Sequence, residues 1–274
     1  MHIDIAEAQE LIKNNKLQEA LQLYLSIDPL EMDYEEQFTI ASDIGFIFYE
    51  LGYYQEAIDY LLQALTIEFT DNGSVNRMLG FAYKHLNNYD LAAEYLEEAV
   101  HLLTNENEKN VCKFELARLL MLLEDFLLAE QYFKDILPFF KGKPSDYYGS
   151  SLYYLGQINI MKRAEDIADE YFNELVKLEN KPHQAHAFFG KLFIANFNQD
   201  GEQMLDLAAK VMALQPDFYE RETITYFTVK AYQYLNDRVT YEAALKQFID
   251  LYPEGKYKSE YEQLKNHVFK VTEI

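Results

Sequence analysis

The sequence predicts an all-α fold, a right-handed solenoid of antiparallel helix pairs. The chain has 274 residues, of which 49% are hydrophobic and 15% are aromatic, so it is not a disordered polymer. It contains only 10 Gly and 6 Pro, few for an all-β protein with many tight turns. Small residues recur at a period close to 37, which indicates a repeat architecture.

The repeat is defined by two sets of recurring positions. The second helix of each unit carries a mark at intervals of 37, 35, 37, 39, 36 and 37 residues: Ala20, Ala57, Ala92, Ala129, Ala168, Met204 and Tyr241. The first helix carries another mark, generally 12 residues upstream: Ala8, Gly45, Gly80, Ala117, Gly156, Gly190 and Val229. We therefore expect about seven repeats in one domain over residues 1–274. The expected repeats are 1–34, 38–71, 73–106, 110–143, 149–182, 183–218 and 222–254.

Each repeat is expected to form two short amphipathic helices. In the third repeat, Leu79, Tyr83 and Leu86 share one helical face by their i, i+4, i+7 spacing. The residues "NNYD" then break the pattern, because Asn and Asp favour turns. Ala92 and Leu96 mark the face of the second helix. One such hairpin cannot bury its apolar face alone, whereas a stack of hairpins can.

Gly80 lies inside the first helix of the third repeat. A glycine in a helix interior costs roughly 1 kcal/mol relative to alanine. Its recurrence as glycine or alanine in most units indicates that the first helix lies close against its partner. We interpret Gly80 as a packing requirement of the fold.

The last segment, residues 256–271, reads as one more helix. Tyr257, Tyr261, Leu264 and Val268 form a single apolar stripe, and the other positions are mostly polar. Such a one-faced helix is expected to cap the exposed edge of the last repeat. The alternative is that this segment begins an eighth repeat of a longer protein.

The bulk composition bears on partners and compartment. A net charge of −22 disfavours binding to nucleic acid or anionic lipid. Cys112 is the only cysteine, so no internal disulfide is possible. The acidic start has no signal-peptide pattern, and no run of 18 apolar residues would span a membrane. We therefore expect a cytoplasmic protein without membrane insertion.

Few residues point to catalysis or metal binding. His183 and His186 are three apart on a helix, but no H-E-x-x-H or similar pattern accompanies them. Lys113 is next to Cys112, yet neighbouring helical residues do not face each other, so the thiol is not expected to be activated. No phosphate-binding or nucleophile-elbow motif is present. We expect no enzyme activity, no cofactor and no metal.

The repeats resemble the tetratricopeptide repeat family. Its signature has L-G-x2-Y in the first helix and A-x3-F in the second, and "LGFAY" at 79–83 with Ala92 and Leu96 fits it. The resemblance covers roughly residues 1–254. It departs from the family at the tryptophan position, where His186 stands in the sixth repeat, and in the last two repeats, which lack the second-helix alanine.

The resemblance implies that the first helices line a concave groove, with five groove positions in each repeat. On these 35 positions the sequence has six bases and one acid, Glu50, although the whole chain has 46 acids and 24 bases. Arg and Lys among aromatic residues suit recognition of an extended or helical peptide. The residues we expect to contact a peptide or protein are Phe46, Tyr49, Arg77, Phe81, Lys84, His85, Phe114, Arg118, Met121, Tyr153, Gln157, Lys191 and Lys230.

The predicted function is a non-enzymatic scaffold or adaptor that binds a protein or peptide segment. The expected segment carries acidic residues together with aromatic or apolar ones. Ser42 and Phe46 stand where the carboxylate-clamp version of the repeat has Lys and Asn, so no chaperone tail is expected to bind. One alternative is a peptide-sensing regulator that lacks its own DNA-binding domain, because the first repeat begins near residue 5. A second alternative is a self-assembling structural protein, which the high net charge disfavours.

Overall fold

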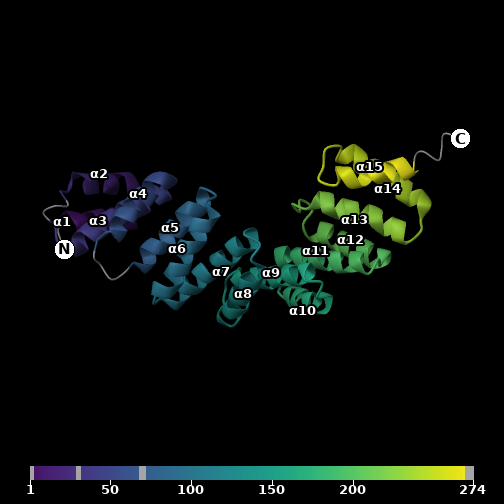
Figure 1. Ribbon diagram of the computed structural model, residues 1–274, viewed down its shortest axis with the longest axis horizontal. Helices are drawn as coiled ribbons and strands as arrows, with labels where there is room; N and C mark the ends of the chain where they lie inside the picture. The colour runs from purple at the N-terminus through teal and green to yellow at the C-terminus, as the bar shows by residue number, and fades with distance from the viewer. Residues whose placement is uncertain (1–2, 29–31, 68–71, 269–274) are drawn as a thin grey trace. The chain divides into compact units, whose positions relative to one another are not determined.

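The structure is a computed structural model that describes residues 3–28, 32–67 and 72–268. Its described residues form fifteen α-helices in sequential antiparallel pairs, as the sequence predicts (Figure 1). Among these residues, no helix is both long and apolar enough to cross a membrane. Pro29 and residues 269–271 of the predicted capping segment lie outside the described residues.

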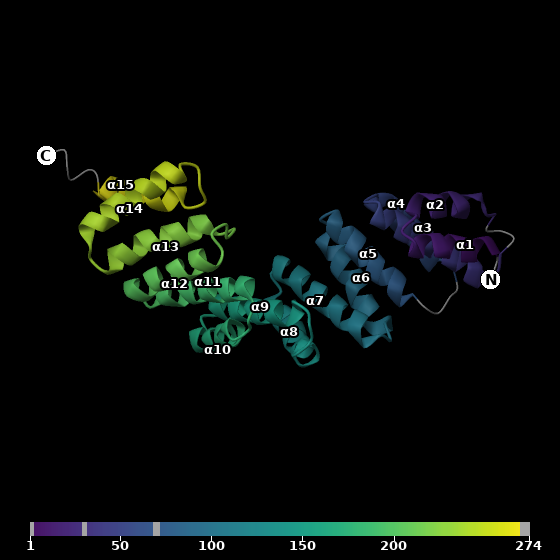
Figure 2. The same cartoon turned by 180° about the vertical axis from the view of Figure 1, so that it is seen from behind.

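The chain divides into two compact units, residues 1–139 and residues 140–274, and each is described by itself. The first unit contains four helix pairs that follow one another in the chain (Figures 1 and 2). Their bounds are α1 Ile3–Lys13, α2 Leu17–Ser26, α3 Tyr34–Glu50, α4 Tyr54–Leu65, α5 Gly73–His85, α6 Tyr89–Leu102, α7 Glu106–Leu122 and α8 Phe126–Phe140. From α1 to α7 each helix packs on its neighbours in sequence, and the ring of Phe114 on α7 packs on that of Phe133 on α8. Among the first helices, α3 contacts both α1 and α5.

The second unit contains three further pairs and a terminal helix. Their bounds are α9 Tyr147–Met161, α10 Glu165–Val176, α11 Lys181–Phe197, α12 Gly201–Leu214, α13 Arg221–Tyr234, α14 Arg238–Leu251 and α15 Lys258–Val268. The first helices α9, α11 and α13 contact one another in that order. This arrangement places residues from successive first helices on one common surface of the unit.

The small residues mark the closest approach of the two helices in a pair. A β-carbon at Gly80 would lie 2.6 Å from Cγ of Leu96 and 3.1 Å from the carbonyl oxygen of Ala92. In the second unit, the Phe172 ring of α10 lies in the space that β-carbons at Gly156 and Gly190 would need. The packing role expected for Gly80 is therefore confirmed.

The turn inside each pair has the same backbone conformation in all seven pairs. One residue has a positive φ between 54° and 82° in each turn: Asn15, Gly52, Asn87, Glu124, Arg163, Gln199 and Asn236. Each of them lies five residues before the second-helix mark of its repeat. The left-handed region favours Gly and Asn, which occupy four of the seven turns.

Met204 and Tyr241 take the place of the second-helix alanine in the last two pairs. Met204 is fully buried and Tyr241 is 8% exposed, and both belong to the core around α11 to α14. The larger side chains therefore fill the space between helices in these pairs, where the sequence pattern was weakest.

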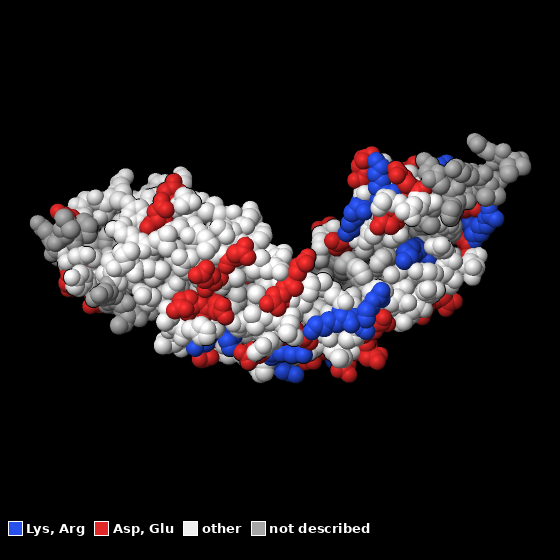
Figure 3. Space-filling model, in the orientation of Figure 1, with Lys and Arg blue, Asp and Glu red and all other residues white. Residues whose placement is uncertain are grey.

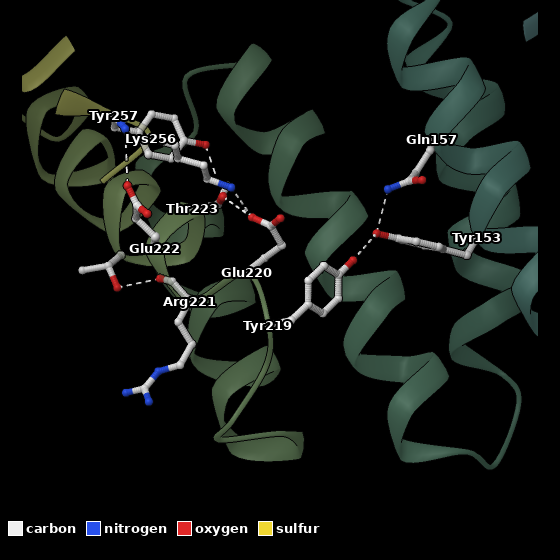
Figure 4. Close-up of polar contacts among 10 residues, drawn as sticks. Tyr153, Gln157, Tyr219, Glu220, Arg221, Glu222, Thr223, Lys256 and Tyr257 are labelled. Carbon is white, nitrogen blue, oxygen red and sulfur yellow. Dashed lines mark hydrogen bonds and ion pairs between the residues drawn. The ribbon is translucent and has the colours of Figure 1, made fainter. Parts of the chain in front are cut away.

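The segment that leads into α15 and the first turn of that helix pack on the last helix pair. Tyr261 is buried against Phe248, and the ring of Tyr257 stacks on that of Tyr226 with centroids 4.1 Å apart. The Lys256 ammonium forms an ion pair with Glu220 (Figure 4). These contacts join residues 256–261 to the last helix pair, and the capping role of the segment stays a prediction.

Candidate functional site

The two units differ strongly in charge. Residues 1–139 contain eight Lys and Arg against 26 Asp and Glu, a formal net charge of −18, whereas residues 140–274 contain 16 against 20, a net charge of −4. The visible face of the first unit in Figure 3 is nevertheless mostly uncharged, with its acidic groups in a few clusters. The visible face of the second unit carries both signs.

Three of the predicted cationic residues gather in the first unit, on α5 and α7. Arg77 contacts Glu108 at 3.0 Å, and the Lys84 ammonium lies 2.5 Å from a carboxylate oxygen of Glu115. Arg118 contacts the same Glu115 carboxylate at 3.2 Å. The expected excess of positive charge is therefore largely neutralised, because two acids outside the predicted groove positions pair with all three bases.

The three cations differ in how accessible they are. The side chain of Arg118 is 41% exposed, while those of Lys84 and Arg77 are 31% and 28% exposed. Arg77 is held further inside, since its Nε atom is buried without a hydrogen-bond partner. Arg118 is consequently the cation of this group that an external carboxylate would reach first.

An aromatic cluster lies at the C-terminal ends of α3 and α5. The rings of Tyr54 and His85 stack with centroids 4.3 Å apart and planes within 3° of parallel. Tyr49 packs on both rings, and its hydroxyl is 3.4 Å from Nε2 of His85. Burial raises the pKa of Tyr49, to which the nearby carboxylates also contribute, so the phenol is neutral at pH 7.

The other predicted residues of the first unit are buried or half-buried. Phe114 is only 5% exposed and packs on Phe133 inside the core, so it does not offer a free ring as expected. Phe46, Phe81 and Met121 are half-buried. We use the name α5–α7 surface for the exposed and half-buried residues that lie together: Tyr49, Tyr54, Arg77, Lys84, His85, Glu108, Glu115 and Arg118.

A second group of predicted residues lies in the second unit. The Gln157 amide donates to the Tyr153 hydroxyl at 2.7 Å, and this hydroxyl is 3.3 Å from that of Tyr219 (Figure 4). Tyr153 itself is 8% exposed, because His186 of α11 packs edge-on against its ring. Tyr153, Gln157 and Tyr219 therefore form one hydrogen-bonded group in the second unit.

Lys191 and Lys230 do not join either group. The Lys191 ammonium lies 2.6 Å from Asp169 of α10, in a separate hollow of about 390 Å³. Lys230 lies over the Tyr234 ring, 5.5 Å from its centroid. The structure thus distributes the predicted site residues over several places.

Cys112 is fully buried in α7, and burial raises the pKa of its thiol to about 12. A thiol held in its protonated form in the core is a poor nucleophile. The expectation that this cysteine is not activated agrees with its environment.

Sequence positions alone missed several residues of these groups. Glu108 and Glu115 stand outside the five groove positions of a repeat, and Tyr219 comes from the loop between α12 and α13. His186 was interpreted only as a packing substitute for tryptophan. Arg77 and Glu108 are 31 residues apart, and so are Lys84 and Glu115; this spacing, close to one repeat, is the signal that would have suggested these two ion pairs.

Comparison with known proteins supports the repeat assignment. Residues 41–71 and 78–102 match the tetratricopeptide repeat family. A search of curated protein sequences gave no match. Solved structures are similar in fold, at sequence identities that establish the fold alone.

Three of these structures are similar over most of their length. The C-terminal part of a TPR repeat-containing protein from Cytophaga hutchinsonii has 16% identity and a TM-score of 0.66, covering 94% of this chain and 98% of that one. A tetratricopeptide repeat protein from Parabacteroides merdae has 17% identity and a TM-score of 0.57, covering 95% of each chain. YrrB, described as a TPR protein with an unusual peptide-binding site, has 23% identity and a TM-score of 0.56, covering 69% of this chain and 90% of that one.

Proposed function

We propose that this chain, which has the fold of tetratricopeptide repeat proteins and matches that family over residues 41–71 and 78–102, is a non-enzymatic scaffold that binds a protein or peptide segment on its α5–α7 surface. The observation that carries the proposal is the meeting of three cations and three exposed or half-buried aromatic rings on helices α3 to α7. Aromatic rings bind at low conformational cost, and Arg pairs with carboxylates in a defined geometry.

The ion pairs define the kind of segment that fits. Glu115 is shared by Lys84 and Arg118. A partner carboxylate that approaches Arg118 competes with Glu115, and an apolar or aromatic side chain can pack on the His85 and Tyr54 stack. We therefore propose a segment with one acidic residue near an aromatic or apolar one, rather than a strongly acidic segment.

The net charge of the first unit affects the rate at which a peptide associates. A net charge of −18 repels acidic segments at long range, so specificity must come from contacts made at the surface. For such a partner, added salt should increase the association rate by screening the repulsion.

The test begins with selection of a binding peptide from a displayed library of 12-residue peptides, using the whole chain as bait. Its dissociation constant is then measured by fluorescence anisotropy for the wild type, for Arg118→Glu and for Lys134→Glu. Lys134 is a matched control, since it is a cation of comparable exposure on the second helix α8.

The proposal predicts that Arg118→Glu weakens binding at least tenfold and that Lys134→Glu changes it less than twofold. Circular dichroism and the thermal midpoint check that both variants are folded. Equal affinity of the folded Arg118→Glu variant for every selected peptide would place the binding site elsewhere.

From the sequence alone we also propose that the protein is cytoplasmic and that it binds neither a cofactor nor nucleic acid. These proposals are consistent with the acidic composition and the single buried cysteine.

A further inference from the structure

A hollow of about 340 Å³ lies at the N-terminal ends of α9 and α11 in the second unit. Its wall includes the aromatic residues Tyr153, Tyr154, His186 and Tyr219. Asp146, the residue before α9, also lines it, and neither Lys nor Arg is among the lining residues. This composition differs from that of the α5–α7 surface, where cations are central.

The aromatic rings of this hollow are held in fixed relative positions. The centroids of Tyr153 and His186 lie 4.9 Å apart, and those of His186 and Tyr219 lie 5.8 Å apart. Phe218 is buried behind them, with its centroid 5.1 Å from that of His186. The faces of aromatic rings carry partial negative charge, so they attract a cation although the rings have no net charge.

Several polar atoms at the hollow can accept hydrogen bonds. His186 donates from Nδ1 to the carbonyl oxygen of Pro182 at 2.7 Å, which leaves Nε2 as an acceptor in the neutral ring. Burial lowers the pKa of His186, so the ring is neutral at pH 7. The hydroxyls of Tyr153 and Tyr219 and the carboxylate of Asp146 supply further acceptor oxygens.

One acidic side chain, that of Asp146, is among the lining residues of the hollow. The side chain of Asp146 is 84% exposed, and its oxygen lies 3.4 Å from Nε2 of His183. Glu220 is next to Tyr219 in sequence and is paired with Lys256 (Figure 4). An anionic ligand would find no Lys or Arg at the wall, and a purely apolar ligand would offer no donor to Nε2 of His186.

We propose that this hollow binds an organic cation, the ammonium or guanidinium group of a lysine or arginine side chain presented by a partner. Such a group has three to five N–H donors for the acceptors of the wall, and it packs on the rings by cation–π attraction. This site is independent of the α5–α7 surface and selects a residue of the opposite charge.

The direct test uses small probes on the whole chain. Nα-acetyl-lysine methylamide and Nα-acetyl-arginine methylamide are the cationic probes, and Nα-acetyl-norleucine methylamide is the neutral control. Histidine labelled with ¹³C reports binding through the ring resonance of His186, assigned with a His186→Gln variant. The proposal predicts a saturable shift with one or both cationic probes and less than one-fifth of that shift with norleucine at equal concentration.

Variants then locate the cation. Tyr219 is 64% exposed, so Tyr219→Ala is expected to fold normally and to weaken probe binding at least fivefold. Tyr219→Phe keeps the ring and should stay within twofold of the wild type, while Asp146→Asn should weaken binding two- to fivefold. Tyr34→Ala removes a tyrosine of similar exposure in the first unit and should have no effect.

Shifts by the lysine probe alone, by the arginine probe alone or by both support the proposal and define which cation is preferred. Equal shifts with norleucine would overturn it, and so would wild-type affinity in a folded Tyr219→Ala variant. If Tyr219→Ala does not fold, unchanged affinity of Asp146→Asn overturns it instead.

Discussion

The Lys84 ammonium on α5 lies 2.5 Å from a carboxylate oxygen of Glu115 on α7. The two residues are 31 positions apart, so this ion pair joins the first helices of adjacent repeats. The Glu115 side chain is only 14% exposed, and it also accepts from Arg118. Glu115 therefore determines how much of the positive charge of the α5–α7 surface is available to a partner.

We predict that Glu115→Gln strengthens binding of a selected peptide that carries an acidic residue by about threefold to tenfold, equivalent to roughly 0.7–1.4 kcal/mol. The substitution removes the carboxylate that competes with the partner for Lys84 and Arg118. Fluorescence anisotropy measures the effect. Glu130→Gln is the control, because Glu130 pairs with a cation within the second helix α8.

The same variant should lower stability slightly. Leaving two cations close together without their shared acid is expected to cost about 1 kcal/mol, since the pair is only partly exposed. Urea unfolding measures this loss. Weaker binding by a folded Glu115→Gln variant would contradict the competition argument.

A second prediction concerns Gly80. By helix propensity alone, Gly80→Ala would stabilise the chain by roughly 1 kcal/mol. We predict instead a destabilisation of about 1–3 kcal/mol, because the added β-carbon would lie 2.6 Å from Cγ of Leu96. Urea unfolding of the variant measures the change.

A double-variant cycle identifies the cause. Leu96→Ala removes the two side-chain atoms that a β-carbon at position 80 would approach most closely, and it leaves the Ala92 carbonyl oxygen at 3.1 Å. The double variant Gly80→Ala/Leu96→Ala should therefore lose less free energy of unfolding than the two single variants lose in sum, by about 0.5–3 kcal/mol. Simple additivity would show that Leu96 is not the obstacle.

The contrast between Gly80 and Glu115 shows what the sequence could predict. Close helix approach requires a small residue at a fixed position in every repeat, so the periodicity of the small residues predicted the helix pairs. The ion pairs need only two complementary side chains in different repeats, so they do not appear among the small residues that mark the repeat. Tyr219 was missed for another reason, because it lies in a loop and the groove positions were counted only on the first helices.

The burial of Phe114 illustrates a further limit of position counting. The expectation treated it as part of the groove, yet its ring packs on Phe133 of α8. Whether such a ring faces out or in depends on the rotation of its helix about its own axis. That rotation is set by packing between helices, which a list of positions within one repeat does not contain.

A third prediction concerns the turn at Glu124, where φ is 62°. A left-handed conformation costs a residue with a β-carbon about 1–2 kcal/mol, and glycine avoids most of that cost. Since glycine is also more flexible in the unfolded chain, Glu124→Gly should raise the free energy of unfolding by about 0.5–1 kcal/mol net. Chemical denaturation measures the gain.

Glu124→Ala is the matched control for this turn. It removes the same carboxylate but keeps a β-carbon in the left-handed conformation, so its stability should stay within about 0.5 kcal/mol of the wild type. The converse substitution, Gly52→Ala in the second repeat, should destabilise, because Gly52 has a φ of 82° and nothing near it that a β-carbon could contact favourably. An equal gain from Glu124→Ala and Glu124→Gly would attribute the effect to charge instead.

A fourth prediction concerns the pH dependence of stability at Asp43. Burial raises the pKa of this carboxyl group, although hydrogen bonds from Tyr24 at 2.5 Å and Gln9 at 3.2 Å partly oppose the shift. Between its unfolded and folded pKa values, Asp43 therefore binds more protons in the folded chain than in the unfolded one. The free energy of unfolding contributed by this group falls as the pH rises through that interval.

The variant Asp43→Asn cannot ionise at this position. We predict that the free energy of unfolding of this variant minus that of the wild type increases from pH 4 towards pH 7, because the wild type gains a buried negative charge over this range. Urea unfolding at several pH values measures this difference, in which the contributions of the other carboxyl groups largely cancel. Tyr24→Phe removes a hydrogen bond that favours the ionised form, so it should make the loss of stability with rising pH larger than in the wild type. A difference between Asp43→Asn and the wild type that is constant or decreases with pH would show that the folded chain does not raise the pKa of Asp43.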